Sequence, residues 1–200
     1  MDKNTRNPNH PKKGSRIRVD PIRNEADINA IKKLLADNPR DLLLFTIGIN
    51  NGLRAGDLLK LKVAQVRKLK PGQTITIIES KTGKENILMV NKAVAKAIKA
   101  YMDQAAPGDH DYLFPSRKTG QALTVQAVNA LVKKWTRAIN LDGNYGSHTL
   151  RKTFGFMQRV KYGVGFELLA KRFNHSNPSI TMRYLGLSSE EVVDVLMNEI

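Results

Sequence analysis

The chain has 200 residues, of which 41% are hydrophobic and 26% charged, a length and composition that suit one folded domain with an ordinary core. Its formal net charge is +15, and this excess of Lys and Arg favours a polyanionic partner, most commonly nucleic acid. The absence of cysteine excludes disulfides and thiolate metal sites, and the four histidines lack metal-ligand spacing, so we expect no metal and no cofactor. No apolar run approaches the ~18 residues of a membrane-spanning helix, so we expect no membrane partner.

Residues 1–23 form a distinct basic segment at the beginning of the chain. They contain seven Lys or Arg, two Asp and three Pro, with almost no apolar periodicity. This composition predicts a flexible basic arm or linker, which is either a solvated tail or a segment that contacts DNA. We expect the folded domain to span residues 24–200, without a separate domain before it.

Helical patterns follow the basic segment. Residues 24–37 predict an amphipathic helix, because Asn24 can cap it, its apolar residues share one face, and Pro39 follows its end. The run RDLLLFTIGIN at residues 40–50 is apolar nearly all round, which predicts a buried helix that stops at Gly52. A short helix is then expected to begin within LRAGDLLKLKV.

The pattern changes between residues 74 and 90. TITIIES and ENILMV are rich in β-branched and aliphatic residues and flank KTGK, which predicts a β-hairpin with Lys81 at its tip. Helical periodicity then returns for the rest of the chain, at residues 91–103, 124–139, 148–162, 166–173, 178–185 and 188–199. The predicted fold class is therefore α+β, mainly α-helical with a small antiparallel sheet.

Two pairs of polar residues stand out within these helices. Arg54 follows a buried helix, where an arginine needs a partner or a cleft, and Asp57 lies three residues later. His148 and Arg151 share one face near a helix N-terminus, where backbone N–H groups favour an anion. Taken alone, Arg54 and Asp57 are explained equally well by an ion pair on a helix surface, and a solvated helix face is the more frequent explanation of His148 and Arg151. Thr149, Leu150 and Lys152 are assigned to packing or solvent.

The order of the motifs along the chain is more informative than any single residue. GLRAGDLLKL, SKTGKENILMV, HTLRKTF and NHSNPSITMRY follow one another within residues 24–200. In this order they closely resemble the catalytic domain of the tyrosine recombinases, the phage integrase family. The resemblance implies a site-specific recombinase that cleaves and rejoins DNA through a covalent 3′-phosphotyrosine, without metal or ATP. It also implies that Tyr184 is the nucleophile within a catalytic set of Arg54, Lys81, His148, Arg151 and His175.

The chemistry of these side chains suits the roles that the resemblance implies. Arg54 and Arg151 would hold the non-bridging phosphate oxygens as negative charge grows on them. His148 would accept the phenol proton, because a phenol with a pKa near ~10 is a poor nucleophile at neutral pH. Lys81 would protonate the leaving 5′-oxygen, and His175 would donate a hydrogen bond to a phosphate oxygen.

The chain departs from the family pattern at two positions. Asp57 stands where the family usually has Glu, and we expect this shorter carboxylate to support Arg54. Asn174 stands where the family usually has Gly, and Asn also tolerates left-handed backbone. At the hairpin tip, Lys84 is an alternative to Lys81, which matches the first lysine of the family's turn.

Partners and location also follow from the resemblance. It implies double-stranded DNA as substrate and a homotetramer on two DNA sites, with residues 188–200 packing in their own core or docking on a neighbour. The predicted helix at 124–139 carries three basic residues, Lys133, Lys134 and Arg137. They either contact DNA or belong to a solvated basic face. We expect a cytoplasmic, nucleoid-associated enzyme of a bacterium, an archaeon or a phage.

Three alternatives stay open at this point. A type IB topoisomerase would share the active site but rejoin the same strand. A non-catalytic DNA-binding module would use residues 148–162 and 166–173 as a helix-turn-helix. The chain is also either a piece of a longer integrase or a short single-domain member like the fimbrial-type inversion recombinases.

Overall fold

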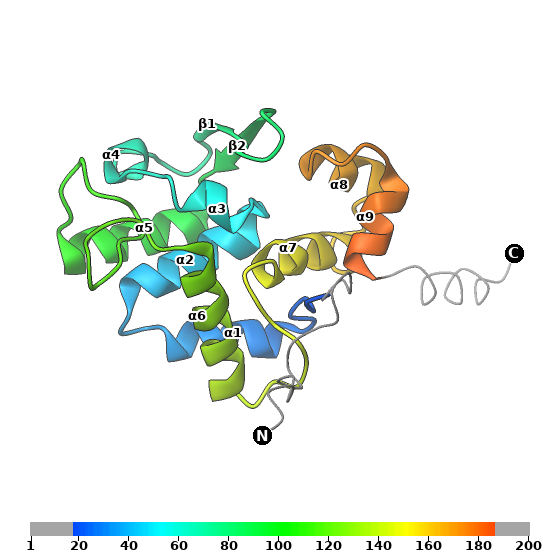
Figure 1. Ribbon diagram of the computed structural model, residues 1–200, viewed down its shortest axis with the longest axis horizontal. Coiled ribbons are helices and arrows are strands. Elements are labelled where there is room, and N and C mark those ends of the chain that lie inside the picture. Colours follow the sequence, from blue (N-terminus) through cyan, green and yellow to red (C-terminus); the bar gives the residue numbers. More distant parts are fainter. Residues whose placement is uncertain (1–17, 187–200) are drawn as a thin grey trace, which may run out of the picture.

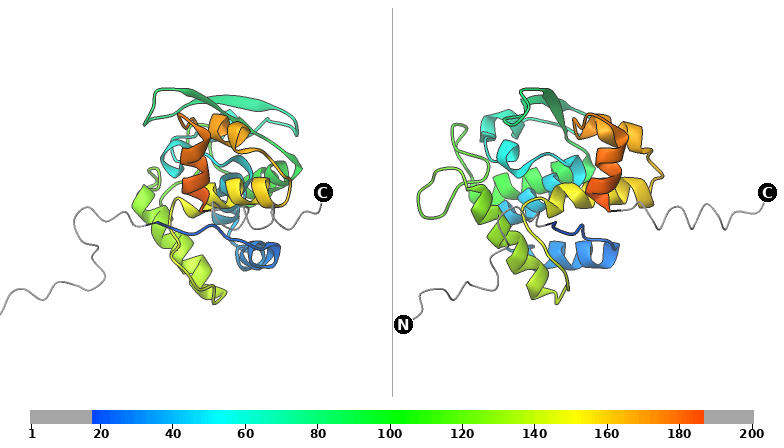
Figure 2. Two further views of the ribbon diagram at one scale, coloured as in Figure 1. Left: turned by 90° about the vertical axis from the view of Figure 1, so that its right-hand side faces the viewer. Right: turned by 45° about the vertical axis from the view of Figure 1, so that its right-hand side comes forward.

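The computed structural model describes residues 18–186, which form a helical body with one two-stranded sheet (Figures 1 and 2). This architecture confirms the predicted fold class. In chain order the elements are α1 (Glu25–Leu34), α2 (Pro39–Asn51), α3 (Ala55–Leu58), α4 (Val63–Val66), β1 (Thr74–Ile78), β2 (Glu85–Met89), α5 (Lys92–Ala105), α6 (Val125–Ala138), α7 (Thr149–Val160), α8 (Phe166–Arg172) and α9 (Pro178–Leu185).

The ends of the first two helices follow from local chemistry. The Asn24 side chain accepts a hydrogen bond from the backbone N–H of Asp27 at 2.8 Å, which confirms the predicted cap of α1. α1 ends at Leu34, and Pro39 opens α2, since proline suits a first helical turn. α2 ends at Gly52 in a left-handed conformation (φ 61°), where a Cβ would also collide with the Phe154 ring.

The hairpin between β1 and β2 is antiparallel and confirms the strand prediction. Its register runs from Thr74 opposite Met89 to Ile78 opposite Glu85. Because strand side chains alternate between faces, Glu79 follows the buried Ile77 onto the inner side of the hairpin. The turn that carries Lys81 thus projects beyond an anchored base.

Two apolar clusters hold the described residues together, and α7 contributes to both. In the main core, Leu150 of α7 packs so closely on α2 that a Cβ at Gly48 would overlap it. The smaller core gathers residues of α7, α8, α9 and the connection after α8: Phe156, Phe166, Leu169, Phe173 and Leu185. In Figure 1, α7 accordingly lies between the α2 side of the molecule and the α8–α9 pair on the right.

The predicted boundary of the basic arm is wrong for residues 18–23. Ile22 is fully buried in the main core, and its N–H donates to Thr153 Oγ1 at 2.9 Å. The N–H of Asp20 donates to the Asn144 carbonyl at 2.7 Å. These contacts fix the segment beside α7. The rest of the predicted arm and the predicted helix at 188–199 lie outside the described residues.

Within residues 18–186, no helix is long and apolar enough to cross a membrane.

Candidate active site

Arg151 connects three parts of the site. It lies on the first turn of α7 with 3% of its surface exposed. Its Nη1 donates to the Gly52 carbonyl at 2.6 Å and its Nη2 to the Phe173 carbonyl at 2.8 Å, while the guanidinium lies 4.4 Å from the Phe173 ring centroid. Burial lowers the pKa of Arg151 to about 10, so it keeps its charge at neutral pH. A fixed cation thus joins the end of α2 to the segment after α8.

Arg54 forms the second cationic centre, and its partner is Glu79. Arg54 Nη1 lies 2.5 Å from Glu79 Oε2, and the Glu79 side chain is fully buried. Thr82 Oγ1 and Asn86 Nδ2 donate to the same carboxylate at 2.7 and 2.9 Å. Burial alone would raise the pKa of Glu79, but Arg54 first, and then Thr82 and Asn86, lower it to about 2. Glu79 therefore holds Arg54 as a permanent carboxylate.

The expected support of Arg54 by Asp57 is a wrong prediction. Asp57 Oδ1 instead accepts hydrogen bonds from the backbone N–H and the hydroxyl of Ser80, at 2.9 and 2.7 Å. The shorter side chain of Asp57 thus binds the backbone at the base of the hairpin turn, next to Glu79. Asp57 fixes the strand end, and Glu79 holds the arginine.

His175 lies on the loop between α8 and α9, beside a buried threonine. Its Nδ1 is 2.8 Å from the hydroxyl of Thr181, which is fully buried. Burial and the charges of Arg151 and Arg54 lower the pKa of His175 to about 4, so the ring is neutral at physiological pH. A Thr181 hydroxyl that donates to Nδ1 leaves Nε2 protonated and able to donate. Just before it, Asn174 has a φ of 53°, which confirms that asparagine takes the left-handed position there.

Tyr184 lies on α9 with its hydroxyl buried. Its ring packs edge-on against Phe173 and His175, with centroids 5.7 and 5.5 Å away. Burial raises the pKa of the hydroxyl to about 12, although the nearby Arg151 and Arg54 charges act to lower it. The phenol is therefore neutral at physiological pH and needs a proton acceptor to react.

A hollow of about 760 Å³ brings together residues that are distant in sequence. It is lined by Arg18, Val19, Lys81, His148, Lys152, Ile180, Arg183 and Tyr184. His148 is the residue just before α7, and loss of solvent together with the charges of Arg151, Arg54 and Lys81 lowers its pKa. A neutral His148 can accept a proton. Lys81, not Lys84, lines the hollow, which favours the predicted choice between the two lysines.

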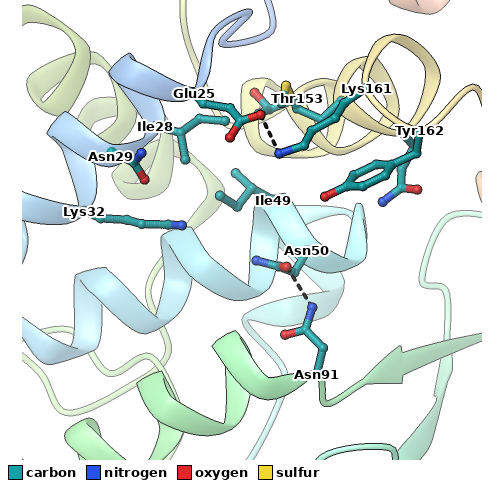
Figure 3. A pocket seen from close by; sticks show the side chains of 12 residues that line it. Glu25, Ile28, Asn29, Lys32, Ile49, Asn50, Asn91, Thr153, Lys161 and Tyr162 are labelled. Atoms are coloured by element: carbon teal, nitrogen blue, oxygen red, sulfur yellow. Dashed lines mark hydrogen bonds and ion pairs between the residues drawn. The ribbon is translucent and has the colours of Figure 1, made fainter.

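Figure 3 shows a second hollow, between α1, α2 and α7. Lys161 Nζ lies 2.5 Å from Glu25 Oε1 across it, and Asn91 Nδ2 donates to Asn50 Oδ1 at 2.8 Å. None of the predicted catalytic residues, all within the described range, lines this hollow. Among residues 18–186, no group of three His, Asp or Glu lies together as a metal site would require.

The arrangement matches a known family over most of the chain. The family model described as "Phage integrase family" matches residues 13–191. The chain belongs to the phage integrase family. It is a tyrosine recombinase catalytic domain, as the relatives also indicate.

Two curated relatives define the similarity in sequence. The domain is 35% identical over 175 residues to "Probable integrase/recombinase YoeC" of Bacillus subtilis, covering 86% of this chain and 92% of that protein. It is 32% identical over 171 residues to "Tyrosine recombinase XerC" of Caldanaerobacter subterraneus, covering 80% of this chain but only 46% of that protein. The chain thus spans nearly all of one relative and about half of the other.

Solved structures share the fold at low sequence identity. The XerA recombinase superposes with a TM-score of 0.73 at 18% identity, covering 94% of this chain and 68% of that one. XerH bound to its difH substrate, in a post-cleavage complex, superposes with a TM-score of 0.71 at 19% identity, covering 91% of this chain and 53% of that one. A lambda integrase dimer bound to a core site superposes with a TM-score of 0.63 at 15% identity, covering 86% of this chain and 49% of that one.

Sequence reasoning missed two charged residues of this recombinase site. Glu79 was part of a predicted strand, and alternation with Ile77 would have turned it inward, where a carboxylate needs a cation. Lys152 was assigned to packing or solvent, yet it is buried and its Nζ lies 5.0 Å from the Tyr184 ring centroid. Its position one residue after Arg151 gave no signal, because neighbouring helical residues point to different faces.

Proposed function

We propose that this recombinase domain cleaves and rejoins DNA strands, with Tyr184 as nucleophile. The observation that carries the proposal is the shared hollow of Tyr184, His148 and Lys81, with the charges of Arg54 and Arg151 acting on the same phenol. Tyr184 Oη would attack a backbone phosphorus, forming a 3′-phosphotyrosine and releasing a 5′-hydroxyl. The ester keeps the energy of the broken bond, so rejoining needs no ATP.

The two arginines suit the role of phosphate clamp. Arg151 uses one N–H from each of two nitrogens for backbone carbonyls, which leaves other donors of its fork to bind phosphate oxygens. Arg54 is held by the ionised Glu79, whose low pKa keeps the pair intact at any physiological pH. Fixed cations stabilise the charge that develops on the phosphate without having to reorganise.

Proton transfer requires an acceptor and a donor in the same hollow. As Tyr184 attacks, its proton would pass to His148, whose lowered pKa leaves it neutral and ready to accept. Lys81, exposed on the hairpin turn, would protonate the leaving 5′-oxygen. His175 would donate from Nε2 to a non-bridging oxygen, in the tautomer whose Nδ1 accepts from the Thr181 hydroxyl. The same groups would act in reverse when a 5′-hydroxyl of another strand attacks.

DNA binding and assembly extend beyond the hollow. The exposed Lys133, Lys134 and Arg137 on α6 would contact DNA phosphates, since the buried side of α6 faces the core. The XerH and lambda integrase structures, which share this fold, contain DNA. We infer a homotetramer on two DNA sites, with residues 188–200 docking on a neighbour, and action at the nucleoid in the cytoplasm.

The recombinase relatives favour strand exchange over the topoisomerase alternative, since they are integrases and recombinases. A non-catalytic DNA-binding module would not explain why Arg54, Lys81 and Tyr184 lie at one site.

Covalent capture tests the proposal. The protein is mixed with nicked duplexes from DNA of its own genomic neighbourhood, in which a cleaved strand loses a short fragment and cannot be rejoined. The wild type should form a protein–DNA adduct that survives denaturant, and Tyr184→Phe should bind the DNA equally without forming it. Binding by the wild type with no adduct would refute the proposal.

A further inference from the structure

Lys152 is a buried cation on the face of the proposed nucleophile. It lies on α7 with 7% of its surface exposed, and its Nζ is 5.0 Å from the ring centroid of Tyr184 on α9. Figure 1 shows these two helices meeting at the right-hand side of the molecule. Burying an ammonium group costs free energy unless a partner compensates for the lost water. The aromatic face of Tyr184 is one such partner.

The charge of Lys152 is less neutralised than that of the neighbouring arginines. Arg54 is paired with Glu79, and Arg151 donates to two backbone carbonyls. Across residues 18–186, no carboxylate lies within 4.0 Å of Lys152 Nζ. Its ammonium is therefore available to interact with the Tyr184 ring.

More distant charges act on the protonation of Lys152 in both directions. Asp20 favours its protonated form, whereas Arg18 and Arg23 oppose it, and burial lowers its pKa. On its own helix, His148 is neutral and Arg151 faces Phe173. The charges of Arg151 and Arg54 act on the Tyr184 hydroxyl, whereas the ammonium group of Lys152 lies over the Tyr184 ring.

We infer that Lys152 is a positioning residue for Tyr184, which holds the ring beneath its ammonium group and stabilises the phenolate that develops during attack. The inference rests on the proposed role of Tyr184 as nucleophile. A cation is attracted to a neutral ring by its quadrupole, and more strongly once the ring carries negative charge. The interaction thus grows as the proton leaves, which is the condition for lowering a barrier and not merely binding the ground state.

The place of the ammonium group distinguishes Lys152 from Lys81. Both lysines line the hollow, but Lys81 is exposed on the hairpin turn, where it would reach the leaving 5′-oxygen. Lys152 has little exposed surface, and its head group faces the ring. Lys81 therefore acts on the leaving 5′-oxygen, and Lys152 acts on the nucleophile Tyr184.

The experiment uses the full chain without DNA. A fluorinated tyrosine, whose phenol is more acidic than that of tyrosine, replaces Tyr184, and its ¹⁹F resonance is followed against pH. In Lys152→Met, the pKa of this phenol should rise by about one, a tenfold loss in its ionisation constant. Lys152→Arg should restore most of the wild-type value, because it keeps the cation. If the Met variant does not fold by circular dichroism, Lys152→Gln gives the same comparison.

The matched control removes a lysine charge that lies over the ring of a different tyrosine. Lys62 Nζ lies 3.2 Å from the Tyr112 ring centroid, and Lys62→Met should leave the phenol at position 184 unchanged. An unchanged pKa in Lys152→Met, or an equal rise in Lys62→Met, would overturn the inference. If the titration responds as expected but Tyr184 forms no DNA adduct, the proposed cleavage fails and the contact between Lys152 and Tyr184 stands. An adduct with an unresponsive titration overturns only the role of Lys152.

Discussion

Replacing Glu79 with Gln tests how the site holds Arg54. The substitution keeps the shape of the side chain but removes the charge that faces Arg54 Nη1 at 2.5 Å. Hydrogen bonds to the buried carboxylate lower its pKa from 4.5 to about 2. At 1.36 kcal/mol for each pKa unit, this shift corresponds to about 3 kcal/mol of folding free energy at neutral pH. We expect Glu79→Gln to lower the free energy of unfolding by about that amount at pH 7.

The pH dependence identifies the carboxylate as the cause. Because the folded-state pKa of Glu79 lies below the unfolded value, its stabilisation is complete above pH 4.5 and is lost as the pH falls toward 2. The difference in the free energy of unfolding between wild type and Glu79→Gln should therefore shrink by about 1.4 kcal/mol for each pH unit below 4.5. Urea unfolding followed by the fluorescence of Trp135, the single and buried tryptophan, measures both proteins across this range.

Glu85→Gln is the matched control, since Glu85 is an exposed residue of the same hairpin. It should change the free energy of unfolding by less than about 0.5 kcal/mol. If Glu79→Gln lowers the free energy of unfolding by less than about 1 kcal/mol, or by the same amount at pH 7 and pH 3, the Glu79 carboxylate does not hold Arg54 in this way.

Two further predictions concern substrate binding and the tautomer of His175. Replacing Lys133, Lys134 and Arg137 together with Ala should weaken DNA binding and reduce the slope of log affinity against log salt by about 3, near one for each lost phosphate contact; an unchanged slope in a binding titration would exclude α6 from the interface. Thr181→Val removes the hydroxyl 2.8 Å from His175 Nδ1, so single-turnover cleavage should slow by about tenfold, whereas Thr181→Ser should cleave like the wild type. Equal rates in the Val and Ser variants would contradict the role of that hydroxyl.

Much of the fold could be predicted from the sequence, because the determining signals are local. The Asn24 cap, the left-handed Gly52 and the hairpin around KTGK all depend on neighbouring residues, and each was found where predicted. The segment at 18–23 was predicted wrongly because its order depends on distant partners. Ile22 is fixed by Thr153, which is 131 residues later in the chain.

The site shows the same division between local and distant information. The ordered motifs identified the family, but not which carboxylate holds Arg54. Asp57 was the nearest acid in sequence, whereas Glu79 is the nearest in space, because β1 delivers it to the inner side of the hairpin. Lys152 was overlooked for a similar reason, since its partner lies on another helix, α9. Partners across elements depend on packing, which a single sequence does not specify.

If Tyr184 is the nucleophile, it becomes linked to the 3′-phosphate of a cleaved DNA strand. The direct measurement is to digest the trapped adduct with protease and nuclease and to sequence the modified peptide by mass spectrometry, using substrates labelled at either strand end. We expect a single modified residue, Tyr184, that carries a 3′-linked nucleotide. A 5′ linkage, or attachment to any other residue, would contradict it.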